Sequence, residues 1–245
     1  MNNTIDNKNL NAKVLNARAE GTKVKDNNQQ NDFEAPEHDL TTTEALSQYL
    51  KANAGTRQGR SIPPLDKWHP KQTADMDLVI KANGEWWHEG ALMTRESLVA
   101  LFSTVLWAEK NEDKIDYYLK TPVQKLRITV EDVPLLINDV GIVEEVIDGQ
   151  QLSWLEFTTT TGDIVRLDEA HPITLRAYKP KQTEHPFDEL PVRPYMPVRN
   201  GLTALIGRNT FYHLTEIGDL SEQQGETVLT LHSGGQSYSL SMPIS

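Results

Sequence analysis

Two short patterns that resemble each other constrain the fold of this chain more than any other feature. Each contains Asn-Gly, at residues 83–84 and at residues 200–201, after a run of strand-forming residues. In each, five residues separate this glycine from a second one, Gly90 or Gly207. Asn-Gly is the strongest short hairpin signal, because both central residues of a type I′ turn need positive φ. We therefore expect a tight hairpin at both places.

A helix is predicted after each hairpin. Thr94 and Asn209 are residues that commonly cap helix N-termini. The first helix has apolar residues at i, i+3, i+4, i+7 and i+8, the spacing of a buried helix face. These residues are Leu98, Leu101, Phe102, Val105 and Leu106. The second predicted helix covers residues 211–217. The repeated order of strand, turn, strand and helix predicts an α+β fold of two similar strand-hairpin-helix units side by side.

Composition divides the 245 residues into four segments. Residues 1–60 are rich in Asn and poor in aromatic residues, so we expect a disordered leader, interrupted by a short helix at 43–53 with Thr43 as its cap. The first unit is predicted at 61–148 and the second at 149–218, with a boundary near Asp148-Gly149. Residues 219–245 are predicted to add a β-hairpin, because apolar and serine residues alternate there.

Net charge limits the classes of partner. The chain carries −11 at pH 7, and acidic and basic residues balance within residues 1–60. The acidic remainder repels phosphate backbones and anionic membrane surfaces, so we expect neither nucleic acid nor membrane as a partner.

The chain has no cysteine, which fits a reducing compartment. No secretory signal is visible at the N-terminus. A cytoplasmic location is the expectation.

The most basic stretch of the predicted folded part supplies the first candidate contacts. It contains Lys120, Thr121 and Lys125, and it is followed by Glu131 and Asp132. Its cations are suited to hold a phosphate or a carboxylate. Alternatively, they pair with acidic residues on neighbouring strands, which would contribute little to stability.

Aromatic residues supply one further candidate. Trp87, next to Trp86, could stack on a planar ligand. The alternative is that one of the two tryptophans enters the core and the other packs on the proline-containing segment around Trp68.

No pattern of catalytic residues stands out. The only hint of a metal site is Asp75 and Asp77, since paired carboxylates suit Mg²⁺ or Mn²⁺; on strand-forming residues they can equally be solvent-exposed. The histidines lack metal-ligand spacing, and neither a nucleophile elbow nor a phosphate-binding loop is present. We therefore assign no catalytic residue, no metal and no cofactor.

Six blocks of sequence, in this order, resemble a bacterial family of uncharacterised proteins, the domain of unknown function 1285. The resemblance covers roughly residues 61–218 and is specific as a set. The blocks are residues 63–70 with 75–78, Gly84-Glu85-Trp86, Leu98 to Leu106, residues 121–125, residues 130–134, and Asp168 to Pro172. One departure from the pattern is Ala74, where the family more often has glycine.

The resemblance implies a duplicated α+β core whose second unit is similar to a pleckstrin-homology-like barrel. It implies a ligand-binding or signalling role at the junction between the units, with no ligand established. The family has no defined catalytic residues, so the resemblance transfers none.

Three functional hypotheses follow. The first is a binding or sensor module for an unknown small molecule at the junction, using Trp87, the basic stretch and the acidic pair. The second is a metal-dependent hydrolase or transferase using Asp75, Asp77, Glu131 and Asp132. The third is an adaptor that binds a protein partner by strand addition at the hairpin within residues 219–245.

Overall fold

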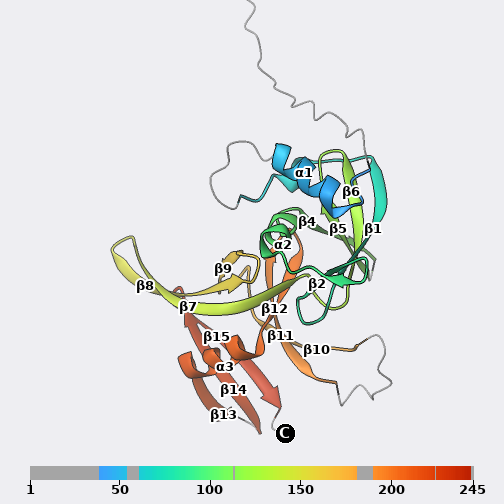
Figure 1. Cartoon of the computed structure of the whole chain (residues 1–245). Coiled ribbons are helices and arrows are strands. Elements are labelled where there is room, and N and C mark those ends of the chain that lie inside the picture. The colour runs from blue at the N-terminus through green and yellow to red at the C-terminus, as the bar shows by residue number, and fades with distance from the viewer. Residues whose placement is uncertain (1–38, 54–60, 113, 181–189, 224, 244–245) are drawn as a thin grey trace, which may run out of the picture. The chain divides into compact units, whose positions relative to one another are not determined.

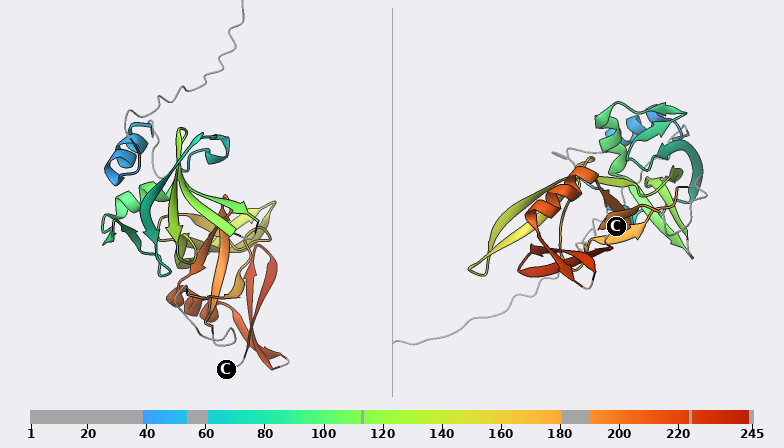
Figure 2. Two further views of the ribbon diagram at one scale, coloured as in Figure 1. Left: turned by 90° about the vertical axis from the view of Figure 1, so that its right-hand side faces the viewer. Right: turned by 90° about the horizontal axis from the view of Figure 1, so that it is seen from below.

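The computed structural model describes residues 39–53, 61–112, 114–180, 190–223 and 225–243 (Figures 1 and 2). Three sheets and three α-helices make up this part of the chain, and most of its regular structure is strand. The predicted disorder of residues 1–38 and 54–60 lies outside the described residues. No helix in the described ranges is long and apolar enough to span a bilayer.

The first sheet has six strands in the order β3-β2-β1-β6-β5-β4. Its strands are β1 (Gln72–Ile80), β2 (Trp86–His88), β3 (Ala91–Leu92), β4 (Leu106–Asn111), β5 (Lys114–Lys120) and β6 (Gln124–Val130). Only the central pair is parallel, with Ile80 opposite Val130. The other neighbours are antiparallel. The sheet is therefore two three-stranded meanders joined along their inner strands.

The second sheet repeats this topology, with the order β10-β11-β12-β7-β8-β9. Its strands are β7 (Leu135–Ile147), β8 (Gln150–Thr159), β9 (Ile164–Arg166), β10 (Thr174–Ala177), β11 (Val192–Arg199) and β12 (Leu202–Ile206). Again only the central pair is parallel, here β7 with β12. Strand by strand, β7 to β12 correspond to β1 to β6. The prediction of two similar units is confirmed.

The two Asn-Gly patterns do not occupy corresponding positions in the two units. The first Asn-Gly joins β1 to β2, whereas the second joins β11 to β12, the counterparts of β5 and β6. The helices also differ: α2 (Glu96–Ser103) lies between the third and fourth strands of its sheet, and α3 (Arg208–Ile217) follows the sixth. The duplication is one of strand topology, and the resemblance between the two Asn-Gly patterns reflects local hairpin chemistry.

The two Asn-Gly turns adopt different conformations. Asn200 and Gly201 both have positive φ, at 49° and 73°, as a type I′ turn requires. In the first turn only Gly84 has positive φ, at 87°, and its N–H donates to the carbonyl of Lys81. This is a longer loop that closes with a left-handed glycine.

The expected side-chain caps are not used. The residues before α2 and α3 are Arg95 and Gly207, and neither makes a capping side-chain bond.

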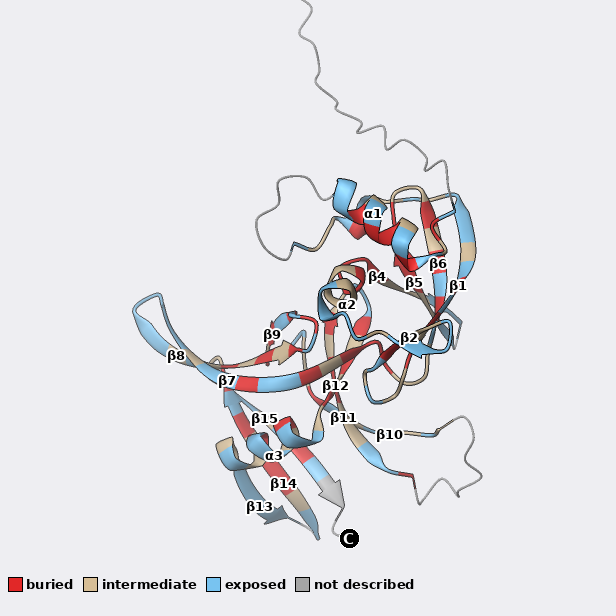
Figure 3. Cartoon of the chain, viewed as in Figure 1, coloured by how far each residue is buried: buried red, intermediate tan, exposed pale blue. Residues whose placement is uncertain are grey.

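α1 (Thr43–Asn53) has the predicted bounds. Its capping hydroxyl belongs to Thr42, whose Oγ1 accepts a bond from the amide of Ala45, and not to Thr43. A short 3₁₀ turn, η1 (Leu65–Lys67), buries Leu65. Leu46 of α1 is fully buried and belongs to the same apolar cluster as the inner faces of both large sheets (Figure 3).

The C-terminal segment is one strand larger than predicted. β14 (Glu226–Ser233) and β15 (Gln236–Pro243) form the expected hairpin, and β13 (Asp219–Gln223) pairs with β14 to make a third sheet. The turn of the hairpin reaches the second sheet, where the Gly234 amide donates to the carbonyl of Ser153. A Cβ on Gly234 would lie 2.3 Å from the Trp154 ring, so only glycine fits there.

Two expectations about the second unit need correction. The boundary predicted at Asp148-Gly149 falls on the turn between β7 and β8, which pair along their length. The change from one sheet to the next occurs between Val130 and Leu135. The expected barrel is also not found, because the described strands of the second sheet form an open order with β10 and β9 at its edges.

Candidate ligand site at the junction of the two sheets

The structure divides the predicted contact residues among separate places. Lys125 forms an ion pair with Glu109, with Nζ 2.7 Å from Oε2, and lies over the Tyr118 ring. Lys120 is opposite Lys125 across β5 and β6, and its Nζ lies 3.8 Å from the centre of the Trp107 ring. The alternative of pairing with acidic residues is thus seen for Lys125, whose partner is Glu109 of β4.

Burial dominates the electrostatics of Lys120. Lys120 is 5% exposed, and its burial lowers the pKa of its ammonium group, against the opposing effect of the Glu109 carboxylate. Thr121 is fully buried, and its hydroxyl bonds only to the backbone of Gln124 within the β5–β6 turn. These contacts make the stretch part of the framework of the first sheet.

Glu131 and Asp132 lie in the segment that connects the two large sheets. Glu131 binds Lys81 Nζ at 2.8 Å and the amide of Ala82. Asp132 accepts bonds from Arg193 Nη1 at 3.0 Å and from the Tyr195 hydroxyl at 2.9 Å. The acidic pair therefore links the β1–β2 turn to β11.

The Tyr195 hydroxyl is well shielded. Its pKa is raised above the ordinary tyrosine value, first by burial and then by the bond that it donates to Asp132. A raised pKa means that the folded state holds this proton more tightly than the unfolded state. The associated stability is complete below the ordinary pKa of about 10, and it is lost as the pH rises from there towards the folded-state pKa.

This linkage gives a first prediction. In Tyr195→Phe, the free energy of unfolding should fall less steeply between about pH 9 and pH 11 than in the wild type. Urea denaturation across this range measures the slope. Tyr212→Phe, at an exposed tyrosine of α3, is the matched control and should keep the wild-type slope. An unchanged slope in Tyr195→Phe would contradict the assignment.

The remaining predicted residues lie on the first sheet. Trp87 in β2 donates its Nε1 proton to Glu85 Oε2. Asp75 and Asp77 are exposed on β1, and Asp75 pairs with Arg127 at 3.3 Å. On the parallel neighbour β6, the residue opposite Asp75 is Arg127. Arg127 lies roughly 10 Å along the strand from Val130, the residue that precedes Glu131 and Asp132. Among the described residues no three His, Asp or Glu side chains could hold one metal ion, so the four carboxylates are not brought together.

A cavity lies between the two large sheets, at the junction where a ligand site was expected, but none of the predicted contact residues lines it. Its volume is about 340 Å³. The first sheet contributes the β1–β2 turn and the residues before α2, α2 contributes one side, and the second sheet contributes the start of β7 and the turn after β8. The lining residues are Asn83, Gly84, Glu85, Trp86, Leu92, Met93, Glu96, Val99, Ala100, Leu136, Thr160 and Thr161.

Gly84 brings the two sheets close together at this cavity. Its φ of 87° disfavours any other residue. A Cβ at this position would lie 2.9 Å from Leu136 Cδ2, closer than packed atoms approach. The β1–β2 turn can therefore lie on β7 because residue 84 has no side chain.

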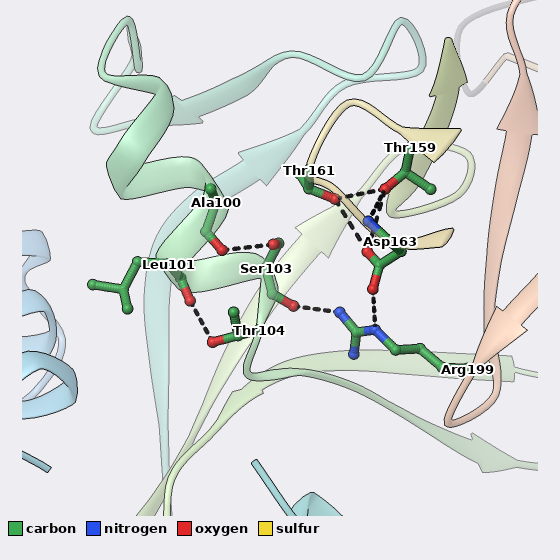
Figure 4. A network of polar contacts seen from close by, with 8 residues as sticks. All are labelled: Ala100, Leu101, Ser103, Thr104, Thr159, Thr161, Asp163 and Arg199. Atoms are coloured by element: carbon green, nitrogen blue, oxygen red, sulfur yellow. Dashed lines mark hydrogen bonds and ion pairs between the residues drawn. The ribbon is translucent and has the colours of Figure 1, made fainter. Parts of the chain in front are cut away.

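A polar network holds the α2 side of the cavity against the second sheet (Figure 4). Arg199 Nε lies 2.7 Å from Asp163 Oδ1, and Arg199 Nη2 donates to the Ser103 carbonyl at 2.6 Å. Asp163 is 5% exposed and its other oxygen accepts bonds from Thr159 and Thr161. Since Ser103 ends α2 and Thr161 lines the cavity, this network fixes the distance between two of its walls.

The comparisons with known proteins agree with this architecture. The model of the N-terminal domain of DUF1285, a domain of unknown function, matches residues 63–133, and the model of its C-terminal domain matches residues 140–240. The chain belongs to the DUF1285 family. The junction between the two matched domains falls on the segment that connects the two large sheets.

Two solved structures are similar to this DUF1285 chain. One is a DUF1285 family protein from Silicibacter pomeroyi DSS-3, with 32% identity and a TM-score of 0.59, covering 79% of this chain and 94% of the other. The other is a DUF1285 family protein from Shewanella baltica OS155, with 26% identity and a TM-score of 0.40, covering 57% and 91%. No curated protein matches the chain.

The cavity of this DUF1285 chain could not be found from one motif. Its lining comes from four stretches that are separate in sequence, and half of the lining residues are ordinary apolar ones. Asn83-Gly84 was predicted only as a hairpin turn, which does not indicate a ligand site.

Proposed function

We propose that this chain is a binding module whose small-molecule ligand occupies the cavity between the two large sheets. The observation that carries the proposal is that both sheets contribute to one cavity of about 340 Å³. Concave sites of this size at the junction of structural units commonly bind small molecules. The buried Arg199–Asp163 pair supports a preformed site, because it ties α2 to the second sheet beside the cavity.

The lining favours a ligand with an apolar body and a cationic group. Leu92, Met93 and Val99 offer apolar surface, and Glu85 and Glu96 are the charged lining residues. No lysine, arginine or histidine lines the cavity. An amine would therefore be attracted, whereas a carboxylate or phosphate of the same size would be repelled. The anionic headgroup of a phosphoinositide does not fit this lining.

A matched pair of indoles tests the proposal. Tryptamine and indole-3-acetate share a ring and differ in charge. We expect tryptamine to raise the melting temperature, since a ligand at a hundred times its Kd stabilises by about 2.7 kcal/mol, and indole-3-acetate to have no effect. Calorimetric titration would give the affinity. A negative result for tryptamine and for a wider panel of apolar amines would contradict the proposed ligand class.

Two substitutions locate the site. Glu96→Gln removes one carboxylate from the lining and should weaken tryptamine binding several-fold while leaving the fold intact, because Glu96 is exposed on α2. Thr160→Trp should fill part of the cavity and abolish binding. Glu216→Gln, at an exposed position of α3, is the charge-matched control and should bind as the wild type does.

A further inference from the structure

The outer part of β7 has one edge without a strand partner. β12 pairs with β7 only from Leu135 to Ile137, while β8 accompanies β7 to Ile147. Within the ranges that the structure describes, no strand pairs with the other edge of residues 139–147. An unpaired edge of this length is a template for another extended segment.

The hydrogen bonds of β8 show which groups of β7 face this edge. The Leu155 amide donates to Ser233 Oγ, and the Leu155 carbonyl accepts a bond from Leu167, so both point away from β7. Leu155 is opposite Ile142, which is therefore a pair without mutual hydrogen bonds. The N–H and C=O of Ile142 consequently point to the open edge. Because hydrogen-bonded and non-hydrogen-bonded pairs alternate along the strand, the N–H and C=O of Glu144 and Val146 also point to the open edge.

The side chains along this edge are exposed, and several are apolar. Ile142 is 57% exposed and Val146 is 70% exposed, although α3 contacts β7 (Figure 3). Charge in this hairpin has one sign: residues 135–153 contain Asp139, Glu144, Glu145 and Asp148, and no lysine or arginine, although Glu145 pairs with Arg166 of β9. The edge thus offers backbone groups, apolar side chains and negative charge together.

The other edge of the hairpin is covered from Ser153 onwards. Gly234 bonds to the Ser153 carbonyl and Ser233 bonds to Leu155, so the turn of the third sheet continues the ladder where β9 ends. Among the described strands, the longer open edge of this hairpin is therefore that of β7.

We propose that residues 142–146 bind an extended segment of another protein by β-strand addition, the segment alternating basic and apolar residues. Backbone bonds would come from Ile142, Glu144 and Val146, and basic side chains would face the acidic residues. A second copy of this chain fits poorly, because pairing two β7 edges brings the carboxylates of both copies together. This site is independent of the cavity between the sheets.

The test uses the full chain and a fluorescent peptide of eight alternating lysine and valine residues, followed by anisotropy. We expect saturable binding that weakens as NaCl rises from about 50 mM to about 300 mM. A peptide N-methylated on every amide keeps its charge and loses the donors of both edges, so it should bind at least about tenfold more weakly.

Two variants of one residue separate backbone pairing from charge. Glu144→Pro removes a donor that faces the open edge without removing a bond to β8, and should weaken binding about tenfold or more. Glu144→Gln keeps the donor and should weaken binding only modestly. Circular dichroism checks that Glu144→Pro folds; if it does not, the N-methylated peptide with the wild-type chain still decides.

Three outcomes would overturn the proposal. The first is the absence of saturable binding of the lysine–valine peptide to the wild type. The second is equal binding of the N-methylated peptide, which would indicate charge attraction alone. The third is a dimer of this chain that Glu144→Pro converts to a monomer, which would make a second copy the occupant of the edge.

Discussion

Replacing Arg199 with alanine is expected to lower the free energy of unfolding by about 3–5 kcal/mol, the range measured when one partner of a buried ion pair is removed. Asp163 would keep its two threonine contacts and lose its cation while 5% exposed. The Ser103 carbonyl would lose its bond from Nη2. Urea denaturation followed by tryptophan fluorescence measures the change.

The control for this variant is Arg127→Ala. Arg127 also pairs with an aspartate, but both partners are exposed, so little change in stability is expected. Arg199→Lys should fall between the two, because one ammonium group cannot reproduce a planar guanidinium that serves both Asp163 and Ser103. If Arg199→Ala lowered the free energy of unfolding no more than Arg127→Ala does, the prediction would be wrong. Water would then replace the contacts of Arg199 with no loss of stability.

Replacing Ser233 with alanine is expected to cost roughly 2–6 kcal/mol, since two backbone groups would lose their bonds at about 1–3 kcal/mol each. Ser233 is 1% exposed. Its Oγ accepts from the Leu155 amide at 3.1 Å and donates to the Leu167 carbonyl at 2.8 Å. One hydroxyl therefore holds the third sheet both to β8 and to the residue that follows β9.

Hydrogen exchange distinguishes this role from general packing. In Ser233→Ala the Leu155 amide should exchange faster than its neighbours, because its acceptor has gone. Ser239→Ala, on the exposed side of β15, should change neither the stability nor the exchange of Leu155. An unaffected Leu155 amide would mean that another acceptor takes over.

Sequence patterns predicted the type of a local element better than the residue at which the element ends. The spacing of Leu98 to Leu106 predicted one helix, and all five apolar residues are buried or half-buried. Yet α2 ends at Ser103, and Leu106 already belongs to β4. The hydroxyls of Ser103 and Thr104 bond back to the carbonyls of Ala100 and Leu101, a competing local interaction that periodicity does not register.

Pairings between distant residues could not be predicted in the same way. The run of strand-forming residues before Asn83-Gly84 is β1, and the alternation of Met76, Leu78 and Ile80 puts these residues on its buried face. Nothing in that alternation indicates that β6 is its parallel neighbour. The same limit applies to the candidate site: Asp132 was recognised as a candidate, but Arg193 and Tyr195, which bind it, are about sixty residues away in sequence.

The parallel pair at the centre of each large sheet determines how much loop-closure entropy that sheet loses on folding. Every other pairing in these sheets joins strands that are consecutive in sequence. The central pairs, Ile80 with Val130 and Leu135 with Ala204, instead close loops of about 50 and about 70 residues. Closure entropy grows only with the logarithm of loop length, so the longer loop costs merely about 0.3 kcal/mol more. The meanders can form from local contacts, and both sheets then face nearly the same entropic barrier to joining their halves.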